Sequence, residues 1–543
     1  MTINLPKPLK TYQYRDLTVF SLLDVDTDRV LPHLFELCVK GGRSSPSLTK
    51  ADDFAGYRDR LLSSGFVVGF DDADDQALLD GWLRSCVVEM GVVGRSHRGE
   101  QMVAVAPLTL AAYRAGLPIQ RVRQRGVADF VYFLLLAEMR NRGSAAERAD
   151  LRTLVATMVG RGLAIGPAPE WEPQLADAAQ LDISALLEFR FVQGFETKGA
   201  RSVDEVSADS PLPGVSAGIG ATLLSHIRAY GDRLPTQALM SSFAALMALS
   251  AFSFTLRADA AARELLRTGV LPPDMRDDAP PSALELYCDF TGDIGSESDK
   301  LTRRCVERDL DRVRLAFRDR MTFVVVENAL TRMTAERERR TTLRRPEQLE
   351  QLASLREHRS VENYAGGRVD DIVAEPGPDA TELEREFLGR TQGGSDTELD
   401  KLLNILEYVN LNKATTNAVM WFRSVGGLAK PYGLLDGTLR SRRSWRYAPS
   451  DELLTALLLA VFVRADGANY RPTMSLRELL DALRDRFGIL IDRPPAFLDG
   501  AEARAAATAN LEAFKRRLQL LGCFDSLSDD FSVQRVRHPL GDS

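Results

Sequence analysis

The sequence predicts a mainly α-helical, multidomain protein with small β wings, in which winged-helix-like modules stand at both ends of a helical middle. Three observations predict this fold class. The chain has 543 residues and a mass of 60.0 kDa, which corresponds to about three or four domains. Apolar residues recur at helical spacing through most of its length. Near each end, a helical pattern is followed by short extended segments around a polar turn.

The composition is that of a folded globular chain. With 45% hydrophobic and 27% charged residues, collagen-like, fibrous and wholly disordered classes are excluded. The formal net charge of -7 excludes a uniformly basic coat, so any contact with nucleic acid must come from local patches. Only 10 of the 69 basic residues are lysine. This arginine bias indicates a GC-rich bacterial genome rather than a device for binding phosphate.

Cysteine usage and the N-terminal sequence predict a cytoplasmic protein. The five cysteines are scattered and none forms a CxxC pair, which argues against a disulfide framework or a zinc knuckle. The N-terminal residues, MTINLPKPLKTYQYRDL, lack the apolar core of a signal peptide. Residues 234–256 carry no charge and are long enough to span a bilayer. Because they include Pro235, Gln237 and several serines, we expect a buried helix there and no membrane contact.

The first predicted module, residues 1–118, has the elements of a small winged domain. A helix is predicted over residues 75–90, where apolar residues recur every three or four positions. Gly91 ends this helix, and short extended segments lie on either side of a charged turn, RSHRGE. Helix, strand, basic turn and strand is the order at the end of a winged-helix domain, although other small α+β domains share it. Arg95 and Arg98 in the turn are candidate phosphate contacts.

The second predicted domain, residues 119–271, is helical. Helices are predicted over residues 126–139 and 145–160 from their apolar spacing. Residues 186–196 alternate well enough for a short strand. Residues 211–220 are rich in glycine, proline and serine, which predicts a connector.

A long helix is the most regular element of the next region, residues 282–345. If it is continuous over residues 296–340, it is about 65 Å long. Between residues 303 and 345, thirteen arginines stand against seven acids, which is typical of a face that contacts solvent or a partner. The apolar stripe indicates a core or helix-pairing surface and consists of Val306, Leu310, Val313, Phe317, Met321 and Val324.

The chain after the long helix divides into a linker and a C-terminal module. Residues 346–395 lose hydrophobic periodicity and gain charge, glycine and proline, which predicts a partly disordered linker. Residues 396–543 then show a helix, helix, strand, helix and wing, which is again the winged-helix order. The expected elements are helices over 396–411, 452–463, 476–487 and 501–521, a short extended piece over 489–491, and a hairpin over 523–536.

No catalytic signature is present, and we expect neither an enzyme nor a bound metal or cofactor. The glycine-dense residues 214–221 lack the lysine of a Walker loop and the spacing of GxGxxG, which favours a flexible turn. Asp182, Glu196 and Lys198 superficially match the acid and ExK pattern of metal-dependent nucleases, but ordinary surface charges explain them better. The five histidines have no ligand spacing, and no serine lies in GxSxG.

A basic and aromatic stretch at residues 421–447 is the strongest functional signal. It has the sequence WFRSVGGLAKPYGLLDGTLRSRRSWRY, with six basic residues against one acid. Basic groups attract phosphates and aromatic faces stack on unpaired bases, although arginine stems also cover cores or meet acidic partners. The predicted nucleic-acid contacts are Arg423, Lys430, Arg440, Arg442, Arg443, Trp445 and Arg446, together with Arg95 and Arg98 of the N-terminal turn and Lys515, Arg516 and Arg517 of the helix predicted over residues 501–521.

The C-terminal quarter resembles a known group of proteins. Residues 475–495, SLRELLDALRDRFGILIDRPP, and residues 527–540, LSDDFSVQRVRHPL, are similar to the tails of large accessory proteins from bacterial anti-phage defence islands. Such proteins are encoded beside methyltransferases, ATPases and kinases. The resemblance implies a non-enzymatic component that works with nucleic acid or with other subunits, and it transfers no site residues.

These observations lead to three functional hypotheses. The first is a nucleic-acid-binding accessory subunit of a multiprotein anti-phage system, with DNA or RNA and other subunits as partners. The second is a protein scaffold or adaptor without nucleic acid, because winged helices serve that purpose too. The third is a divergent metal-dependent nuclease built on Asp182, Glu196 and Lys198. The first requires that basic side chains from separate modules form one continuous face.

Overall fold

A computed structural model describes most of the chain. The described residues are 3–44, 68–82, 88–91, 101–104, 109–115, 123–142, 151–165, 173–181, 201–202, 208–524 and 534–541, with a few single positions between 56 and 65 and between 185 and 189.

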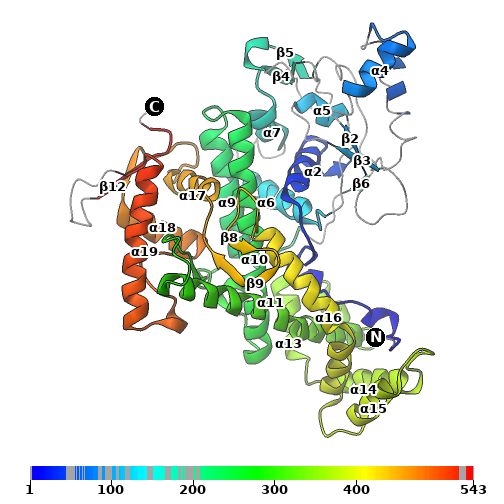
Figure 1. Cartoon of the computed structure of the whole chain (residues 1–543). Helices are drawn as coiled ribbons and strands as arrows, with labels where there is room; N and C mark the ends of the chain where they lie inside the picture. Colours follow the sequence, from blue (N-terminus) through cyan, green and yellow to red (C-terminus); the bar gives the residue numbers. More distant parts are fainter. Residues whose placement is uncertain are drawn as a thin grey trace.

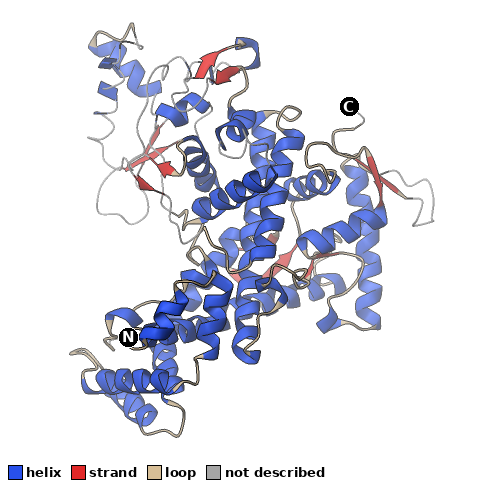
Figure 2. Cartoon of the chain, turned by 180° about the vertical axis from the view of Figure 1, so that it is seen from behind, coloured by secondary structure: helices blue, strands red, loops and turns tan. Residues whose placement is uncertain are grey.

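The protein is mainly α-helical with small two-stranded sheets, as predicted (Figure 2). The described helices of the N-terminal half are α1 (Arg15–Thr18), α2 (Thr27–Val39), α4 (Ala73–Trp82), α5 (Leu110–Ala115), α6 (Val127–Arg142), α7 (Leu151–Val159), α9 (Pro213–Tyr230) and α10 (Thr236–Thr268). The remaining helices are α11 (Glu297–Leu330), α12 (Thr334–Arg340), α13 (Arg345–Ser354), α14 (Arg359–Ala374), α15 (Glu382–Gln392), α16 (Glu398–Val425), α17 (Asp451–Phe462), α18 (Leu476–Phe487) and α19 (Ala501–Leu520).

The strands of the described part pair two by two. The antiparallel pairs are β1 (Arg43–Ser44) with β6 (Arg201–Ser202), β2 (Val88–Gly91) with β3 (Gln101–Ala104), β4 (Leu163–Ile165) with β5 (Pro173–Leu175), β8 (Leu435–Thr438) with β9 (Ser441–Tyr447), and β10 (Thr473–Ser475) with β12 (Arg535–Arg537). One pair is parallel and joins β7 (Leu286–Tyr287) to β11 (Ile489–Leu490).

Two long helices, α10 and α11, organise the core (Figure 1). Helix α10 packs against α9, α11 and α17, and α11 packs against α16, α19 and β9. A buried ion pair joins the two helices, with Arg320 Nη2 2.7 Å from Asp259 Oδ2. By length and composition α10 is the one helix of the described part that could cross a membrane, but 78% of its most apolar stretch is buried by the protein itself. This burial agrees with the predicted core helix.

The long arginine-rich helix is shorter and more deeply buried than the sequence predicted. Helix α11 ends at Leu330, and α12 follows after a turn instead of continuing the same axis. At the usual rise per residue α11 is about 50 Å long. Its charged residues contact neighbouring helices as well as solvent, because Arg318 forms ion pairs with Asp400 and Glu407 of α16. The expectation of a free charged face is therefore wrong for this part of α11.

The predicted linker, residues 346–395, is folded into helices α13, α14 and α15. Their apolar residues are few, but Leu352, Val361 and Val369 are fully buried. Short amphipathic helices with dense charge show little periodicity in the sequence, which is why a disordered linker was expected. Capping residues also define their ends: the hydroxyl of Thr381 accepts a hydrogen bond from the backbone N–H of Glu384 in a capping box.

The predicted connector at residues 211–220 is also helical. Pro213 occupies the first turn of α9, where a backbone N–H has no acceptor within the helix, so the missing N–H of proline removes no helical hydrogen bond. Gly220 lies where α9 crosses α6, and a Cβ there would approach the carbonyl oxygen of Leu134 to 2.9 Å. Close helix packing therefore explains this glycine, whereas composition alone suggested a flexible turn.

The N-terminal region differs from the expectation in its elements and its boundary. Helix α4 ends at Trp82, and β2 begins within the residues predicted to be its last turn. Helix α2 packs against α6, and the ring of Tyr14 stacks on Phe323 of α11 at 5.7 Å. Packing thus continues across the expected boundary near residue 118. Of the strand expected at residues 186–196, positions 186 and 189 are helical and the others lie outside the described residues.

The C-terminal elements occur in nearly the predicted order. Helix α17 is followed by β10, α18 and α19, and then Phe524 forms a bridge to Val536 of β12. Strand β12 also pairs with β10, with Met474 opposite Val536. The short extended piece after α18, β11, leaves this module and pairs with β7. Helix α19 packs on α11 at the edge of the molecule (Figure 1).

Candidate nucleic-acid interface

The basic and aromatic stretch forms the end of α16, a loop and the β8–β9 hairpin. Strands β8 and β9 pair with a register shift between Asp436 and Thr438. Gly437 lies in this bulge with φ +133°, and a Cβ there would lie 2.7 Å from the carbonyl oxygen of Ser444. Only glycine fits this position without strain. The hairpin packs against α11 through β9.

The aromatic residues of the stretch belong to the core. Trp421, Phe422, Trp445 and Tyr447 are between 0% and 2% exposed, and Tyr432 is also buried. Trp445 Nε1 donates a hydrogen bond to the carbonyl oxygen of Thr438 at 2.9 Å. Alternation along β9 places Trp445 and Tyr447 on the inner face. The prediction that Trp445 contacts nucleic acid is therefore wrong, because its ring is not available for stacking on a base.

Arg446 is also engaged within the protein. Its Nη2 atom lies 2.7 Å from Asp436 Oδ2, and its Nη1 atom lies 3.4 Å from Asp289 Oδ2 and 3.5 Å from Asp299 Oδ1. Burial lowers the pKa of Arg446, but the hydrogen bond and the charge of Asp436 outweigh this effect and raise it. With three carboxylates around a side chain that is 12% exposed, Arg446 is not free to bind phosphate. Its predicted role as a contact is wrong.

Three other arginines of the hairpin are exposed. Within the described part of the chain, no carboxylate lies within ion-pair distance of Arg440, Arg442 or Arg443. We call these three residues the hairpin tip. Arg303 of α11 donates a hydrogen bond from Nη1 to the carbonyl oxygen of Arg443 at 2.6 Å, which fixes the outer end of β9 against the helix. The tip is therefore a rigid element that presents positive charge.

The remaining predicted contacts have different surroundings. Lys430 is exposed and lies 3.7 Å from Asp26 Oδ1. Arg423 is half-buried in the last turn of α16. On α19, Lys515 forms an ion pair with Glu512 at 2.7 Å and Arg517 with Asp451 at 2.6 Å, whereas Arg516 is exposed. Arg95 and Arg98 lie outside the described residues, as do Asp182, Glu196 and Lys198.

No catalytic arrangement appears among the described residues. They contain no group of three or more His, Cys, Asp or Glu side chains that could hold a metal ion. His226 Nε2 lies 2.8 Å from the hydroxyl of Ser242, but both residues are buried and burial lowers the pKa of His226 to about 3. A base so strongly desolvated and closed to solvent is a packed core residue.

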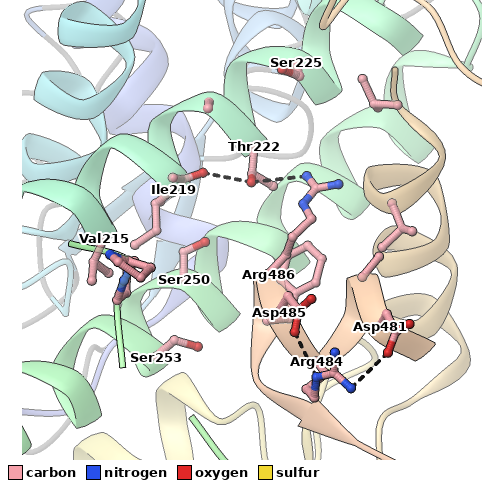
Figure 3. A pocket seen from close by; sticks show the side chains of 18 of the residues that line it. Val215, Ile219, Thr222, Ser225, Ser250, Ser253, Asp481, Arg484, Asp485 and Arg486 are labelled. Carbon is pink, nitrogen blue, oxygen red and sulfur yellow. Dashed lines mark hydrogen bonds and ion pairs between the residues drawn. The ribbon is translucent and has the colours of Figure 1, made fainter. Parts of the chain in front are cut away.

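A cavity that no sequence motif indicated lies between α9, α10 and α18. Its volume is about 1160 Å³. The walls combine small residues of α9 and α10 with arginines and acids of α18 (Figure 3). One feature of the sequence is consistent with this cavity, namely the small residues at helical spacing within residues 214–225. Because this segment is rich in glycine and proline, it was predicted to be a turn.

Fold and site together describe a mainly helical protein with an exposed arginine cluster on one hairpin. The family model of the methylation-associated defense system protein MAD7 matches residues 7–540, and the chain belongs to this family. The match covers nearly the whole chain, whereas the resemblance seen in the sequence was limited to the last quarter. No curated protein and no solved structure matches the chain.

Proposed function

We propose that this protein is a nucleic-acid-binding accessory subunit of its defence system, and that the hairpin tip contacts the phosphate backbone. The observation that carries the proposal is the exposure of Arg440, Arg442 and Arg443 on a chain whose net charge is -7. Arginine offers a planar fork of donors that matches phosphate oxygens. Because the neighbouring aromatic residues are buried, the tip is suited to the backbone and not to base stacking.

The C-terminal module supports the same proposal through the order of its elements. Many winged helices have a helix, a strand, two helices and then two strands. The elements α17, β10, α18, α19 and β12 occur in a similar order, but β11 lies between α18 and α19 and pairs with β7, and Phe524 contributes only an isolated bridge before β12. In such a module α19 is the recognition helix. Its inner face packs on the protein through Ala507 and Phe514, so only its outer face, with Arg516, is available to a ligand.

A salt-dependent binding assay tests the proposal. We expect the triple variant R440Q/R442Q/R443Q to bind DNA or RNA at least tenfold more weakly than the wild-type protein. The slope of log affinity against log salt should become shallower by about 2 to 3, since each lost phosphate contact removes about 0.7 to 0.9. Single- and double-stranded substrates of equal length show which form is preferred.

A matched control separates a local contact from general charge. The variant R267Q/R390Q/R504Q removes the same charge from exposed arginines that already face Glu264, Glu386 and Asp499. Affinity and salt slope should stay close to wild type in this control. Equal losses in both variants, or no loss in the hairpin variant, would contradict the assignment of the hairpin tip.

The second candidate function is an adaptor that contacts proteins only. The burial of the aromatic residues favours it, because an arginine tip without stacking partners also fits an acidic protein surface. A stoichiometric complex with another subunit that resists nuclease and contains no nucleic acid would support the adaptor. In either case we propose a cytoplasmic protein that does not itself catalyse a reaction.

A further inference from the structure

The cavity between the central helices and the C-terminal module is long and open on one side. Residues Gly214 to Ser225 of α9 form one wall, and this part of the helix extends over about 16 Å. Ser250 and Ser253 of α10 extend the same wall, and α18 lies opposite (Figure 3). Typical small-molecule sites measure about 300–1000 Å³, so a cavity of 1160 Å³ has room for a nucleotide-sized ligand.

The wall formed by α9 has an apolar part where a ligand can come close to the helix backbone. Val215 and Ile219 line it, with Leu249 beside them on α10. Gly218 lies between them in the helix, and no atom lies within 4 Å of the place where its Cβ would be. Packing within the chain therefore does not explain this glycine, in contrast to Gly220 on the opposite side of α9. The space above Gly218 is part of the cavity.

Most charges that line the cavity are already balanced. Arg484 forms ion pairs with Asp481 and Asp485, at 2.9 and 2.8 Å (Figure 3). Arg257 and Arg471 have acidic partners as well, Asp274 at 3.0 Å and Glu478 at 3.9 Å. Two arginines remain, Arg464 and Arg486, and no carboxylate of the described residues lies within 4 Å of either guanidinium group. Arg464 nevertheless interacts with a nearby acid, because hydrogen bonds lower the pKa of the Asp466 carboxyl and the charge of Arg464 contributes to this shift.

Arg486 has the environment of a cation that lacks its counter-ion. Its Nη1 atom donates a hydrogen bond to the carbonyl oxygen of Ala460 at 2.7 Å, and its Nη2 atom lies 3.4 Å from the hydroxyl of Thr222. Solvent reaches the side chain through the cavity, but the surrounding walls lower its pKa by desolvation. Because Arg486 is open to the cavity and has no carboxylate partner in the described part of the chain, an anion that enters the cavity can pair with it.

Two hydroxyl groups and the second arginine lie at the same end of the cavity. Thr222 and Ser225 are one turn apart on α9, so their side chains share a face. Gly467 lies against Ser225, since a Cβ at this glycine would be 2.9 Å from the serine hydroxyl. Arg464 belongs to the turn that contains Gly467, because the N–H of Gly467 donates to its carbonyl oxygen. This part of the cavity is thus lined by Arg464 and Arg486, by the hydroxyl of Ser225, and by the hydroxyl of Thr222, which donates its own proton to the carbonyl oxygen of Gly218.

We propose that the cavity binds a phosphorylated small molecule of nucleotide size. Its phosphate lies at the end formed by Arg464, Arg486, Thr222 and Ser225, and its less polar part lies over Gly218. Among the described residues Arg486 has no carboxylate partner, and its guanidinium offers several donors in one plane, which suits the several oxygens of a phosphate better than a neutral group. Arg464 adds positive charge to the same cavity. This ligand site is separate from the nucleic-acid contact proposed for the hairpin tip and goes beyond it.

Calorimetry on the full-length protein tests the site with pyrophosphate, AMP and ATP as probes. We expect saturable binding of at least one probe, and a loss of at least tenfold in affinity in the variant R464Q/R486Q. The control R390Q/R504Q removes two exposed arginines outside the cavity and should bind as the wild type does. G218L should weaken AMP and ATP several-fold more than pyrophosphate, because the added side chain fills only the apolar part. Circular dichroism confirms that each variant is folded.

Three outcomes would overturn the proposal. One is the absence of saturable binding of all three probes to the wild-type protein. Another is binding that R464Q/R486Q leaves unchanged. The third is that the wild-type protein binds none of the probes and R464Q/R486Q no longer binds a partner subunit that the wild type binds. That result would show that the cavity is a protein-docking site. Nucleic-acid affinity should be equal in R464Q/R486Q and wild type, so failure of this site and failure of the hairpin contact are distinguishable.

Discussion

At the residue scale, the hydrogen bonds around His538 define its protonation state. Its Nδ1 atom accepts a hydrogen bond from the backbone N–H of Leu540 at 3.0 Å. The proton of the neutral ring therefore lies on Nε2, which faces the hydroxyl of Tyr230 at 2.8 Å, and this hydroxyl in turn donates to the carbonyl oxygen of Leu459. Burial, with a contribution from the charge of Arg233, lowers the pKa of His538 to about 4.

This lowered pKa predicts a loss of stability in acid. A histidine that is harder to protonate when folded contributes stability above its unfolded pKa of about 6.5, and this contribution is lost as pH falls through 4. Relative to H538Q, the wild-type protein should lose about 2 kcal/mol between pH 7.5 and pH 5. Urea unfolding of both proteins across this range measures the difference. A constant difference at all pH values would show that His538 titrates normally.

Two glycines of α9 should respond in opposite ways to substitution by alanine. G218A adds a methyl group to open space and removes the entropic penalty of glycine in a helix, so we expect it to stabilise the protein by about 0.5–1 kcal/mol. G220A places a methyl group against the carbonyl oxygen of Leu134 and should destabilise it by about 1–3 kcal/mol. The midpoints of urea unfolding, at an unchanged m-value, measure both changes in the free energy of unfolding. If both variants change it in the same direction, the packing argument is refuted.

At the scale of elements, a polar network attaches the β8–β9 hairpin to α11. Arg446 of β9 faces Asp289 and Asp299, and the hydroxyl of Tyr447 donates to Asp309 of α11 at 2.9 Å. The backbone N–H of Tyr447 also donates to the hydroxyl of Thr302 at 2.8 Å. The hairpin therefore holds its exposed arginines on a fixed support.

Removal of the buried arginine should break this attachment. We expect R446A to destabilise the protein by about 3–5 kcal/mol, because it leaves the buried carboxylate of Asp289 without its cation and removes one of the two cations at Asp299, which keeps Arg303. The control R442A, on the same strand but exposed, should change stability by less than about 0.5 kcal/mol. Thermal or urea unfolding distinguishes the two variants. Similar changes in the free energy of unfolding for R446A and R442A would show that the network contributes little to stability.

At the scale of the whole molecule, charge is divided between paired and exposed arginines. Arg318 and Arg320 of α11 are paired with acids of neighbouring helices and Arg446 of β9 with three carboxylates, whereas the hairpin tip and Arg516 are exposed. The sequence shows that arginines are abundant but does not show which of them are paired and which are exposed. Lys515, Arg517 and Arg446 are each paired with acidic side chains, so these predicted contacts do not contribute to one continuous basic face from separate modules. The requirement set for the first hypothesis is therefore not met, and the nucleic-acid proposal is reduced to a contact through the hairpin tip.

The amino-acid sequence by itself determined the class of the fold, the helices of the C-terminal module and the core character of α10, because apolar spacing and helix caps are local properties. It also indicated the defence context through its C-terminal residues. Only the tertiary structure decided that the residues from α13 to α15 are folded, that Trp445 and Arg446 lie inside, and that a cavity opens beside Gly218. These features depend on contacts between residues far apart in the chain, such as Arg446 with Asp289, and local composition carries no record of such partners.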